Sequence, residues 1–224
     1  MAMILRPLLF SLPFLSVLAA SAQVPTGASP SAPLFGVNLL MDPGAEATDE
    51  AGQAAWGGSA HFTSKGCGMT AEPYGMTAGV FPKGWGEQNG HGRNLFRFSC
   101  TERKEVRTLP QRFDLTALAD TLDHGHVVGR ITGQMASVGN PGLRGNVVVE
   151  YRNMDDKTIQ VLKTNNLPCA VKGDAWKLTR CAQSGMVPAG TRYAVVYLSM
   201  ILDEDAKPGG SFVMDDVAFE LFQR

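Results

Sequence analysis

Carboxylates suited to hold a metal ion lie near both ends of the folded part of the chain. The segment NLLMDPGAE, residues 38–46, places a Pro-Gly turn where a first strand should begin, just before Glu46, and the segment FVMDDVAFEL near the C-terminus contains Asp215 and Asp216. Calcium takes six to eight oxygen ligands from carboxylates and backbone carbonyls, and turns rich in Gly and Pro expose such carbonyls. If the two ends of the domain are adjacent, the sequence predicts that Glu46 and these aspartates converge on one structural calcium ion.

The two aspartates are consecutive, and this limits how both can serve. Side chains alternate between the faces of a strand, so we expect only one of them, preferably Asp215, to face the ion, and Asp216 to point the other way. The alternative is an ordinary solvated turn that binds no metal, since no spacing here is as diagnostic as an EF-hand loop.

Side chains suited to bind a sugar form two groups. A pyranose is normally held by an aromatic ring against its apolar face and by polar groups that bind its hydroxyls. The first group lies in the glycine-flanked loop FPKGWGEQNGH and consists of Trp85, Gln88 and Asn89. The second group lies on the outward faces of predicted strands and consists of Arg130, Gln134, Arg152, Tyr193 and Tyr197. If these strands are neighbours, their side chains form one polar and aromatic cleft.

Each group has a purely structural alternative. A loop tryptophan can be pinned over the edge of a core. The outward face of a half-exposed antiparallel sheet is polar whether or not it binds a ligand. Catalysis has less support: the chain contains no Gly-x-Ser-x-Gly, HExxH or Walker motif, and its adjacent acid pairs fall in predicted turns without an apolar setting that would raise a pKa. We therefore expect a binding protein, with a small hydrolase as the least favoured alternative.

Short apolar segments separated by turn residues must position these groups. Residues 127–138, VVGRITGQMASV, alternate between apolar and polar positions, and GNVVVEYRN (145–153) precedes a tight turn into TIQVLK. TRYAVVYLSMIL (191–202) is apolar on both faces, and SFVMDDVAFELF (211–222) is a last strand. Strands at intervals of roughly ten residues without intervening helices predict an all-β fold, an antiparallel β-sandwich. Only FDLTALADTL (113–122) shows a helix-like spacing.

The N-terminal segment predicts export. Residues 1–22 combine one positive charge, an apolar run and small residues before a cleavage site, which is typical of a secretory signal peptide. A membrane anchor is the alternative, but Pro13 breaks the apolar run and the run is short for a span. Residues 23–36 are predicted to be a flexible linker and residues 37–224 one domain. We predict a secreted or periplasmic protein with no membrane span after cleavage.

The charge balance and the cysteines fit this location. The chain has 20 Lys and Arg against 21 Asp and Glu, which gives no reason to expect a nucleic-acid partner. An even number of cysteines in an oxidising compartment predicts disulfides, and the chain has four: Cys67, Cys100, Cys169 and Cys181. Of the possible connectivities we favour Cys67–Cys100 and Cys169–Cys181, because each pair flanks its own local segment. A zinc site is the alternative, but no CxxC spacing supports it.

The motifs at the two ends also resemble those of a known family. The pairing of NLLMDPGAE with FVMDDVAFEL is similar to that in the galactose-binding-like jelly roll of family 4 and family 22 carbohydrate-binding modules. Those modules typically open with Asn-Leu-x-x-Asn-Pro-Gly-Phe-Glu and close with an aromatic-x-x-Asp-Asp-Val strand. The resemblance covers residues 37–222, with Asp42 where Asn is usual and Ala45 where Phe is usual.

This resemblance implies a fold, a cofactor and a ligand class. It implies a jelly roll, a structural calcium held by Glu46 with Asp215 or Asp216, and the binding of a glycan or polysaccharide. Because a fold does not fix a function, the alternative is a secreted structural or interaction protein that binds a protein partner at the cell envelope. An exposed aromatic cleft would favour the glycan, and a broad apolar patch would favour the protein partner.

Overall fold

The computed structural model describes residues 34–47, 56, 67–76, 81–100, 105–140, 142–164, 177–202 and 209–224. The predicted signal peptide, most of the predicted linker and Cys169 lie outside these residues. The described strands are β1 (Cys67–Pro73), β2 (Asn94–Cys100), β3 (Val106–Arg107), β4 (Gln111–Asp114), β5 (Val127–Val138), β6 (Leu143–Arg152), β7 (Thr158–Lys163), β8 (Thr179–Met186), β9 (Tyr193–Leu202) and β10 (Ser211–Gln223). Short helical segments are α2 (Trp85–Gln88), η1 (Thr116–Leu118) and α3 (Ala119–Asp123).

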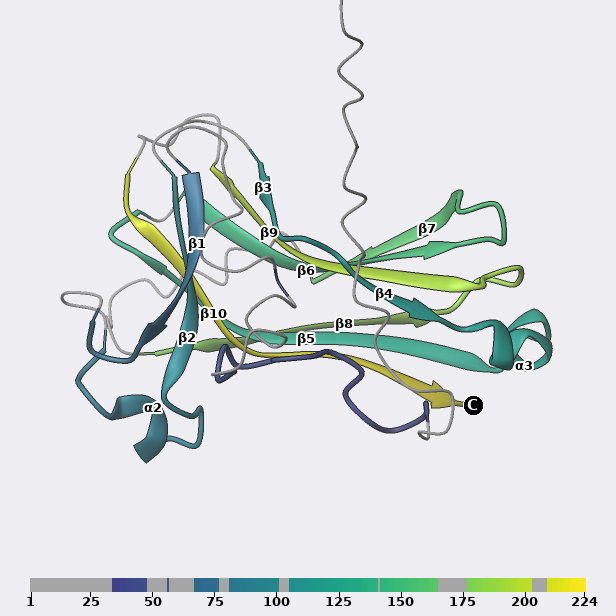
Figure 1. Ribbon diagram of the computed structural model, residues 1–224, viewed down its shortest axis with the longest axis horizontal. Coiled ribbons are helices and arrows are strands. Elements are labelled where there is room, and N and C mark those ends of the chain that lie inside the picture. The colour runs from purple at the N-terminus through teal and green to yellow at the C-terminus, as the bar shows by residue number, and fades with distance from the viewer. Residues whose placement is uncertain are drawn as a thin grey trace, which may run out of the picture.

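The strands form two antiparallel sheets that pack face to face (Figure 1). The first sheet has the order β1-β2-β10-β5-β8, and the second has the order β3-β9-β6-β7, with β4 also paired to β9. From β2 onward the chain changes sheet at every connection except β3–β4 and β6–β7. When β3 and β4 are counted as one interrupted strand beside β9, this is the strand order of a jelly roll. The predicted all-β antiparallel sandwich is therefore confirmed.

Alternating apolar residues on the inner faces of both sheets form the main core. Ile131 and Met135 from β5 and Phe219 from β10 meet Val149 from β6 and Leu198 from β9, and all five side chains are fully buried. Burial of each such side chain stabilises the fold by about 1.5–3 kcal/mol. This core fixes the two sheets, and their outward faces are then free to carry polar side chains.

The segment predicted to be helical is only partly so. Its first residues, Phe113 and Asp114, belong to β4 and pair with Ala194 and Tyr193 of β9. The helical turns of η1 and α3 begin only at Thr116. Burial of Phe113 in the main core outweighs the local helical spacing at the start of this segment.

The first described segment, residues 34–47, lies beside the C-terminal half of β10. The Leu39 N–H donates a hydrogen bond to the Phe219 carbonyl at 2.9 Å. The Asn38 side chain donates to the Val217 carbonyl and accepts from the Phe219 N–H. The segment forms one isolated bridge, between Phe35 and Leu221, but no strand, so the predicted first strand is wrong. The two ends of the domain are adjacent, as expected.

The structure tests the cysteine predictions only in part. Cys67 and Cys100 are directly opposite each other in the β1–β2 pair. Opposite residues in such a pair have Cα atoms about 4.5–5.5 Å apart, within the range that a disulfide spans. Both predicted disulfides stay predictions. Among the described residues, no helix is long and apolar enough to cross a membrane.

Candidate functional site

A bulge in β10 places both aspartates of the closing motif at one point. The register with β5 shifts between Asp215 and Ala218, so β10 carries one residue more than its partner there. Phe212 and Met214 face the core before the bulge, and Val217 faces it afterwards. The apolar alternation therefore changes phase across the two aspartates. Asp216 adopts a positive φ of 47° at this irregularity.

The bulge overturns the prediction that only one aspartate can face an ion. Asp215, Asp216 and His91 each offer a ligand atom, and these atoms lie within 4.8 Å of one another. His91 Nδ1 lies 2.5 Å from Asp216 Oδ2. Strand alternation failed here because an inserted residue rotates the chain between the two side chains. We call Glu46, His91, Asp215 and Asp216 the acidic cluster.

Glu46 reaches the acidic cluster from the opening motif. Its Oε1 accepts hydrogen bonds from the backbone N–H groups of Arg93 at 2.8 Å and Asn94 at 2.6 Å. A Cβ added at Gly44 would lie 3.2 Å from Asp215 Oδ1 and 3.7 Å from Glu46 Cγ, so Gly44 lies between the two carboxylate side chains. A Cβ added at Gly92 would lie only 2.6 Å from Glu46 Oε1, and the φ of Gly92 is +84°. Glycine at position 92 is thus required for the Glu46 carboxylate to lie against the backbone of this loop.

Asp215 is the buried centre of the cluster. Its side chain is fully buried, and it accepts hydrogen bonds from the Tyr74 hydroxyl and from the Asp216 N–H. Burial first, and then the charges of Asp216 and Glu46, raise the pKa of Asp215 to about 8, although its two hydrogen bonds act in the opposite direction. Burial and the neighbouring Asp215 likewise raise the pKa of Tyr74 above its ordinary value.

The donor set fits a divalent cation. Within the described part of the chain, no lysine or arginine side chain forms an ion pair with Asp215 or Asp216, and the charge of Asp216 disfavours ionisation of Asp215. Asp215 and Asp216 supply carboxylate oxygens, the ligand that calcium prefers. The imidazole nitrogen of His91 is a ligand more typical of zinc and other transition metals.

Trp85 and Gln88 begin and end α2 and Asn89 follows it, but the tryptophan ring is used for packing. Its centroid lies 4.6 Å from that of Phe81, and it stacks on His91 with the ring centroids 5.3 Å apart and an interplanar angle of 10°. Gln88 and Asn89 are exposed, and the Asn89 side chain donates back to the Trp85 carbonyl at 2.8 Å. The tryptophan therefore holds the loop, including His91, against a small second core on the outside of the first sheet.

The five predicted sheet residues do not form one cleft. Arg130 and Gln134 lie on β5 in the first sheet, whereas Arg152, Tyr193 and Tyr197 lie on β6 and β9 in the second. Because the two sheets pack through their inner faces, their outward faces point in opposite directions. Arg130 forms an ion pair with Glu220 of β10, with Nη2 2.8 Å from Oε2. The prediction of a single cleft is wrong, although β6 and β9 are neighbours as it required.

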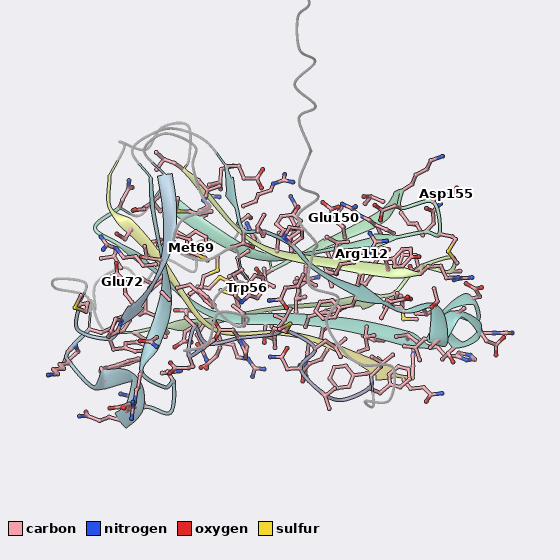
Figure 2. All side chains as sticks on the ribbon, viewed as in Figure 1. Trp56, Met69, Glu72, Arg112, Glu150 and Asp155 are labelled. Carbon is pink, nitrogen blue, oxygen red and sulfur yellow. The ribbon has the colours of Figure 1, made fainter. Side chains whose placement is uncertain are left out.

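The outward side of the second sheet carries a connected polar and aromatic network, which we call the outer face. It consists of Arg112, Glu150, Arg152, Asp156 and Tyr193. Arg152 of β6 is opposite Tyr193 of β9. Val195 of β9 has Arg112 of β4 opposite it on one side and Glu150 of β6 on the other. Figure 2 labels Glu150 and Arg112 in the upper sheet and Asp155 in the β6–β7 turn.

Ion pairs and ring contacts hold the outer face in one geometry. The Arg112 guanidinium lies 3.9 Å from the centroid of the Tyr193 ring, and its Nη1 lies 2.5 Å from Asp156 Oδ1. Arg152 Nη2 lies 2.6 Å from Glu150 Oε2, and Nη1 lies 3.3 Å from Asp156 Oδ2. Sequence reasoning missed Arg112 and Asp156, because their proximity depends on β4 pairing with β9 and on the turn after β6.

The charge state of the outer face is well defined. Burial raises the pKa of the Glu150 carboxyl, but the hydrogen bond and charge of Arg152, together with the Tyr197 hydroxyl, outweigh it and hold the pKa below its ordinary value. The hydrogen bond from Arg112 lowers the pKa of Asp156. The side chains of Arg112, Arg152 and Asp156 are 29%, 26% and 48% exposed, whereas Tyr197 is only 6% exposed. The accessible part of this surface therefore lies around Tyr193 and not around Tyr197.

No family model and no curated protein matches the sequence. Among solved structures, the chain is similar to the enzymatically active domain of tailspike protein 4 from bacteriophage CBA120, with a TM-score of 0.43 and 11% identity over 69% of this chain and 18% of that one. It is similar to the CBM22-1 xylan-binding domain from Paenibacillus barcinonensis, with a TM-score of 0.41 and 15% identity over 73% of this chain and 90% of that one. It is also similar to a CBM4 structure, with a TM-score of 0.32 and 11% identity over 69% and 86% of the two chains. The chain spans less than a fifth of the tailspike chain, and the fold assignment rests on the strand order described above.

Proposed function

We propose that this protein is an exported, non-catalytic binding protein that recognises a glycan or polysaccharide on the outer face. The observation that carries the proposal is the connected network of Arg112, Glu150, Arg152, Asp156 and Tyr193 on one accessible side of the second sheet. A binding surface of this kind needs polar groups whose positions are fixed before the ligand arrives. Ion pairs within β6, and between the β6–β7 turn and Arg112 of β4, supply that order here.

The chemistry of the outer face suits sugar hydroxyls and a sugar ring. Glu150 and Asp156 are acceptors, and Arg152 and Arg112 are donors with unused N–H groups beyond their ion pairs. The Arg112 guanidinium stacked on Tyr193 presents a flat surface against which the apolar face of a pyranose can pack. A polysaccharide chain lying across β9 and β6 would contact these groups in succession.

A glycan array and affinity electrophoresis test this proposal with a matched pair of variants. Arg152→Ala removes an arginine that is paired with a glutamate on the outer face, and Arg130→Ala removes one that is equally paired with Glu220 on the opposite side of the molecule. We expect Arg152→Ala to weaken glycan binding about three- to tenfold, the value of one or two net hydrogen bonds, and Arg130→Ala to leave it unchanged. Equal effects of the two variants, or no binding by the folded wild-type protein across a broad panel, would contradict the outer face as a glycan site.

We further propose that the acidic cluster binds a structural calcium ion through Glu46, Asp215 and Asp216. The proximity of Asp215 to Asp216, with Glu46 of the opening motif on the other side of Gly44, supports this proposal. A bound ion would tie the opening turn to the β10 bulge and neutralise the repulsion around buried Asp215. The melting temperature should rise when calcium is added to chelator-treated protein and should not respond in a variant with Asp216→Asn. A response to zinc but not to calcium would assign the cluster to a transition metal instead.

A protein partner is the second candidate, and exposed apolar side chains favour it. Met154, Ile159 and Val161, in the turn after β6 and in β7, are 60%, 43% and 42% exposed beside the outer face. Replacing Ile159 and Val161 with threonine removes apolar area but leaves the outer face intact. Loss of partner capture by this variant, together with unchanged glycan binding, would separate the two functions.

A further inference from the structure

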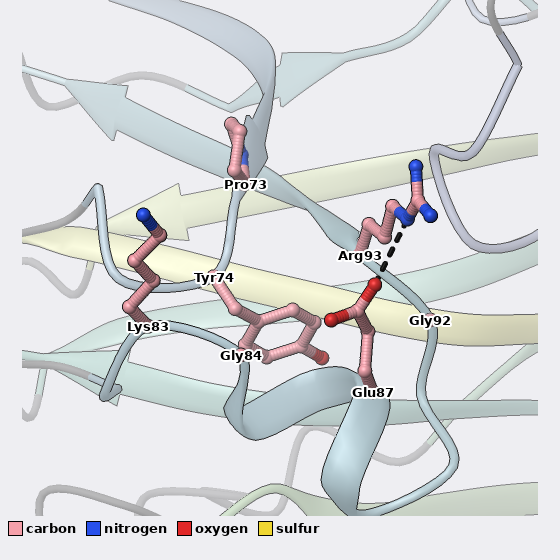
Figure 3. Close-up of a pocket in the computed structure, with 7 residues that line it drawn as sticks. All are labelled: Pro73, Tyr74, Lys83, Gly84, Glu87, Gly92 and Arg93. Carbon is pink, nitrogen blue, oxygen red and sulfur yellow. Dashed lines mark hydrogen bonds and ion pairs between the residues drawn. The ribbon is translucent and has the colours of Figure 1, made fainter.

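A small pocket lies away from the outer face, between the end of β1, the helix α2 and the start of β2 (Figure 3). Its volume is about 230 Å³, below the roughly 300–1,000 Å³ of pockets that enclose drug-sized ligands. A single small group therefore fits it better than a chain does. Tyr74 forms part of its wall, and Gly84 and Gly92 line it with backbone only.

Among the described residues, the charged groups that line the pocket are one ion pair and one lysine. Arg93 Nε lies 2.9 Å from Glu87 Oε1, and the two side chains are 80% and 53% exposed. Within the described part of the chain, Lys83 makes no hydrogen bond or ion pair, and it also lines the pocket. Figure 3 shows Lys83 on one side of the pocket and the Arg93–Glu87 pair on the other, with the Tyr74 ring between them. The pocket thus carries one net positive charge.

The buried side of Tyr74 keeps this wall in place. Its hydroxyl donates a hydrogen bond to Asp215, and the residue is only 4% exposed. A Cβ added at Gly86 would lie 2.3 Å from a carbon of the Tyr74 ring, which shows how closely α2 packs on it. The ring is also packed on Phe81 and Trp85, so it is a fixed and almost fully buried part of the wall.

We propose that this pocket binds a single sugar unit that carries a carboxylate, such as a glucuronate at the end of an acidic glycan. The carboxylate pairs with Lys83, and the hydroxyls bind the Arg93–Glu87 pair. An ammonium without a protein partner is the group that discriminates an acidic sugar from a neutral one. An arginine–glutamate pair offers both the donors and the acceptors that vicinal hydroxyls require.

Titration calorimetry with free glucuronate and with glucose, at matched ionic strength, tests the proposal on the mature protein. We expect glucuronate to bind about fivefold more tightly than glucose, the upper end for an ion pair at an exposed position. Lys83→Gln should reduce glucuronate affinity to that of glucose, whereas Lys157→Gln, a change at an exposed lysine in the β6–β7 turn, should leave the preference intact. Because both lysines are exposed, neither variant should alter folding, which the melting temperature checks.

Three further results would overturn the proposal. Equal affinities of the wild-type protein for glucuronate and glucose would contradict the role of Lys83. Absence of binding by either sugar would contradict the site itself. Displacement of glucuronate by inorganic phosphate at equal concentration would show a simple anion site. An oligosaccharide that ends in glucuronate should bind as the free sugar does, and one that carries glucuronate only at internal positions should not, because the pocket admits one terminal unit.

Discussion

Replacement of Asp215 by asparagine should remove a loss of stability that the wild-type protein undergoes between pH 5 and pH 8 in the absence of divalent cations. Asp215 is fully buried, and its pKa is raised from 3.8 to about 8 by burial and by the charges of Asp216 and Glu46. Below the unfolded pKa both states carry the proton, so the native state bears no penalty. As the pH rises, the unfolded chain releases this proton while the native state retains it, and the native state loses stability until the pH passes the folded pKa.

The size of the effect follows from the pH range between the unfolded and the folded pKa of Asp215. Each unit of difference in pKa corresponds to about 1.4 kcal/mol, so the span from pH 5 to pH 8 covers roughly 4 kcal/mol. For a chain of this size that corresponds to roughly 8–16 °C in Tm. Asparagine is neutral throughout and keeps an acceptor for the Tyr74 hydroxyl. The free energy of unfolding of the variant, relative to that of the wild-type protein, should therefore increase with pH by up to about 4 kcal/mol.

Urea unfolding of both proteins at several pH values between 5 and 8, with chelator present, measures this difference. Asp155→Asn, a change in the exposed β6–β7 turn, is the control for a lost carboxylate. Its free energy of unfolding should differ from that of the wild-type protein by a nearly constant amount over this pH range. Saturating calcium should remove the loss in the wild-type protein, because a bound cation favours the ionised carboxylate, and should not affect the asparagine variant. A difference between wild type and Asp215→Asn that stays within about 1 kcal/mol across the whole range would refute the reasoning.

Three other predictions concern the scaffold. Gly145→Ala should destabilise the fold by about 1–3 kcal/mol in chemical unfolding, because the added Cβ would lie 2.1 Å from a core ring carbon; a neutral result would contradict this packing. Arg192→Ala should return the pKa of the Asp123 carboxyl from about 2 towards 3.8, since the hydrogen bond from Arg192 is the main cause of its depression, and an NMR titration of the carboxyl carbon reads this directly. The Cys67–Cys100 disulfide should appear in peptide mapping without reduction, and replacing both cysteines by serine should cost about 3–4 kcal/mol, whereas detection of free thiols at both positions would disprove the pairing.

The sheets could be predicted from sequence where alternation is uninterrupted. Residues 127–131 alternate between buried and half-exposed positions, and the whole segment 127–138 forms β5. The segment 191–202 is apolar on both faces, and β9 lies between β4 and β6 with nearly every residue buried. The order of the strands could not be derived from periodicity, because pairing depends on contacts far apart in the chain. For this reason Arg130 and Arg152 were assigned to one cleft although they lie in different sheets.

The candidate sites were predictable only to the extent that a local motif carried them. The two end motifs pointed to Glu46 and the aspartates, and the structure brings these together. His91 is contributed by a different loop, and its only sequence signal is the Gly-His-Gly turn at 90–92, in which Gly92 leaves room for Glu46. The phase change in the apolar pattern of β10, with two polar residues between Met214 and Val217, was a readable signal of the bulge.

Backbone strain occurs in the same part of the molecule as the raised pKa of Asp215. Four non-glycine residues in the described part of the chain have a positive φ, and three of them, Asp42, Ala45 and Asp216, lie in the opening turn and the β10 bulge. A left-handed conformation costs an ordinary residue roughly 1–2 kcal/mol, and Ala45, unlike an aspartate, has no polar side chain to offset it. Such strain persists only where surrounding contacts determine the backbone, and here it coincides with a buried carboxyl of raised pKa. The strained residues therefore lie in the two segments that carry Glu46, Asp215 and Asp216.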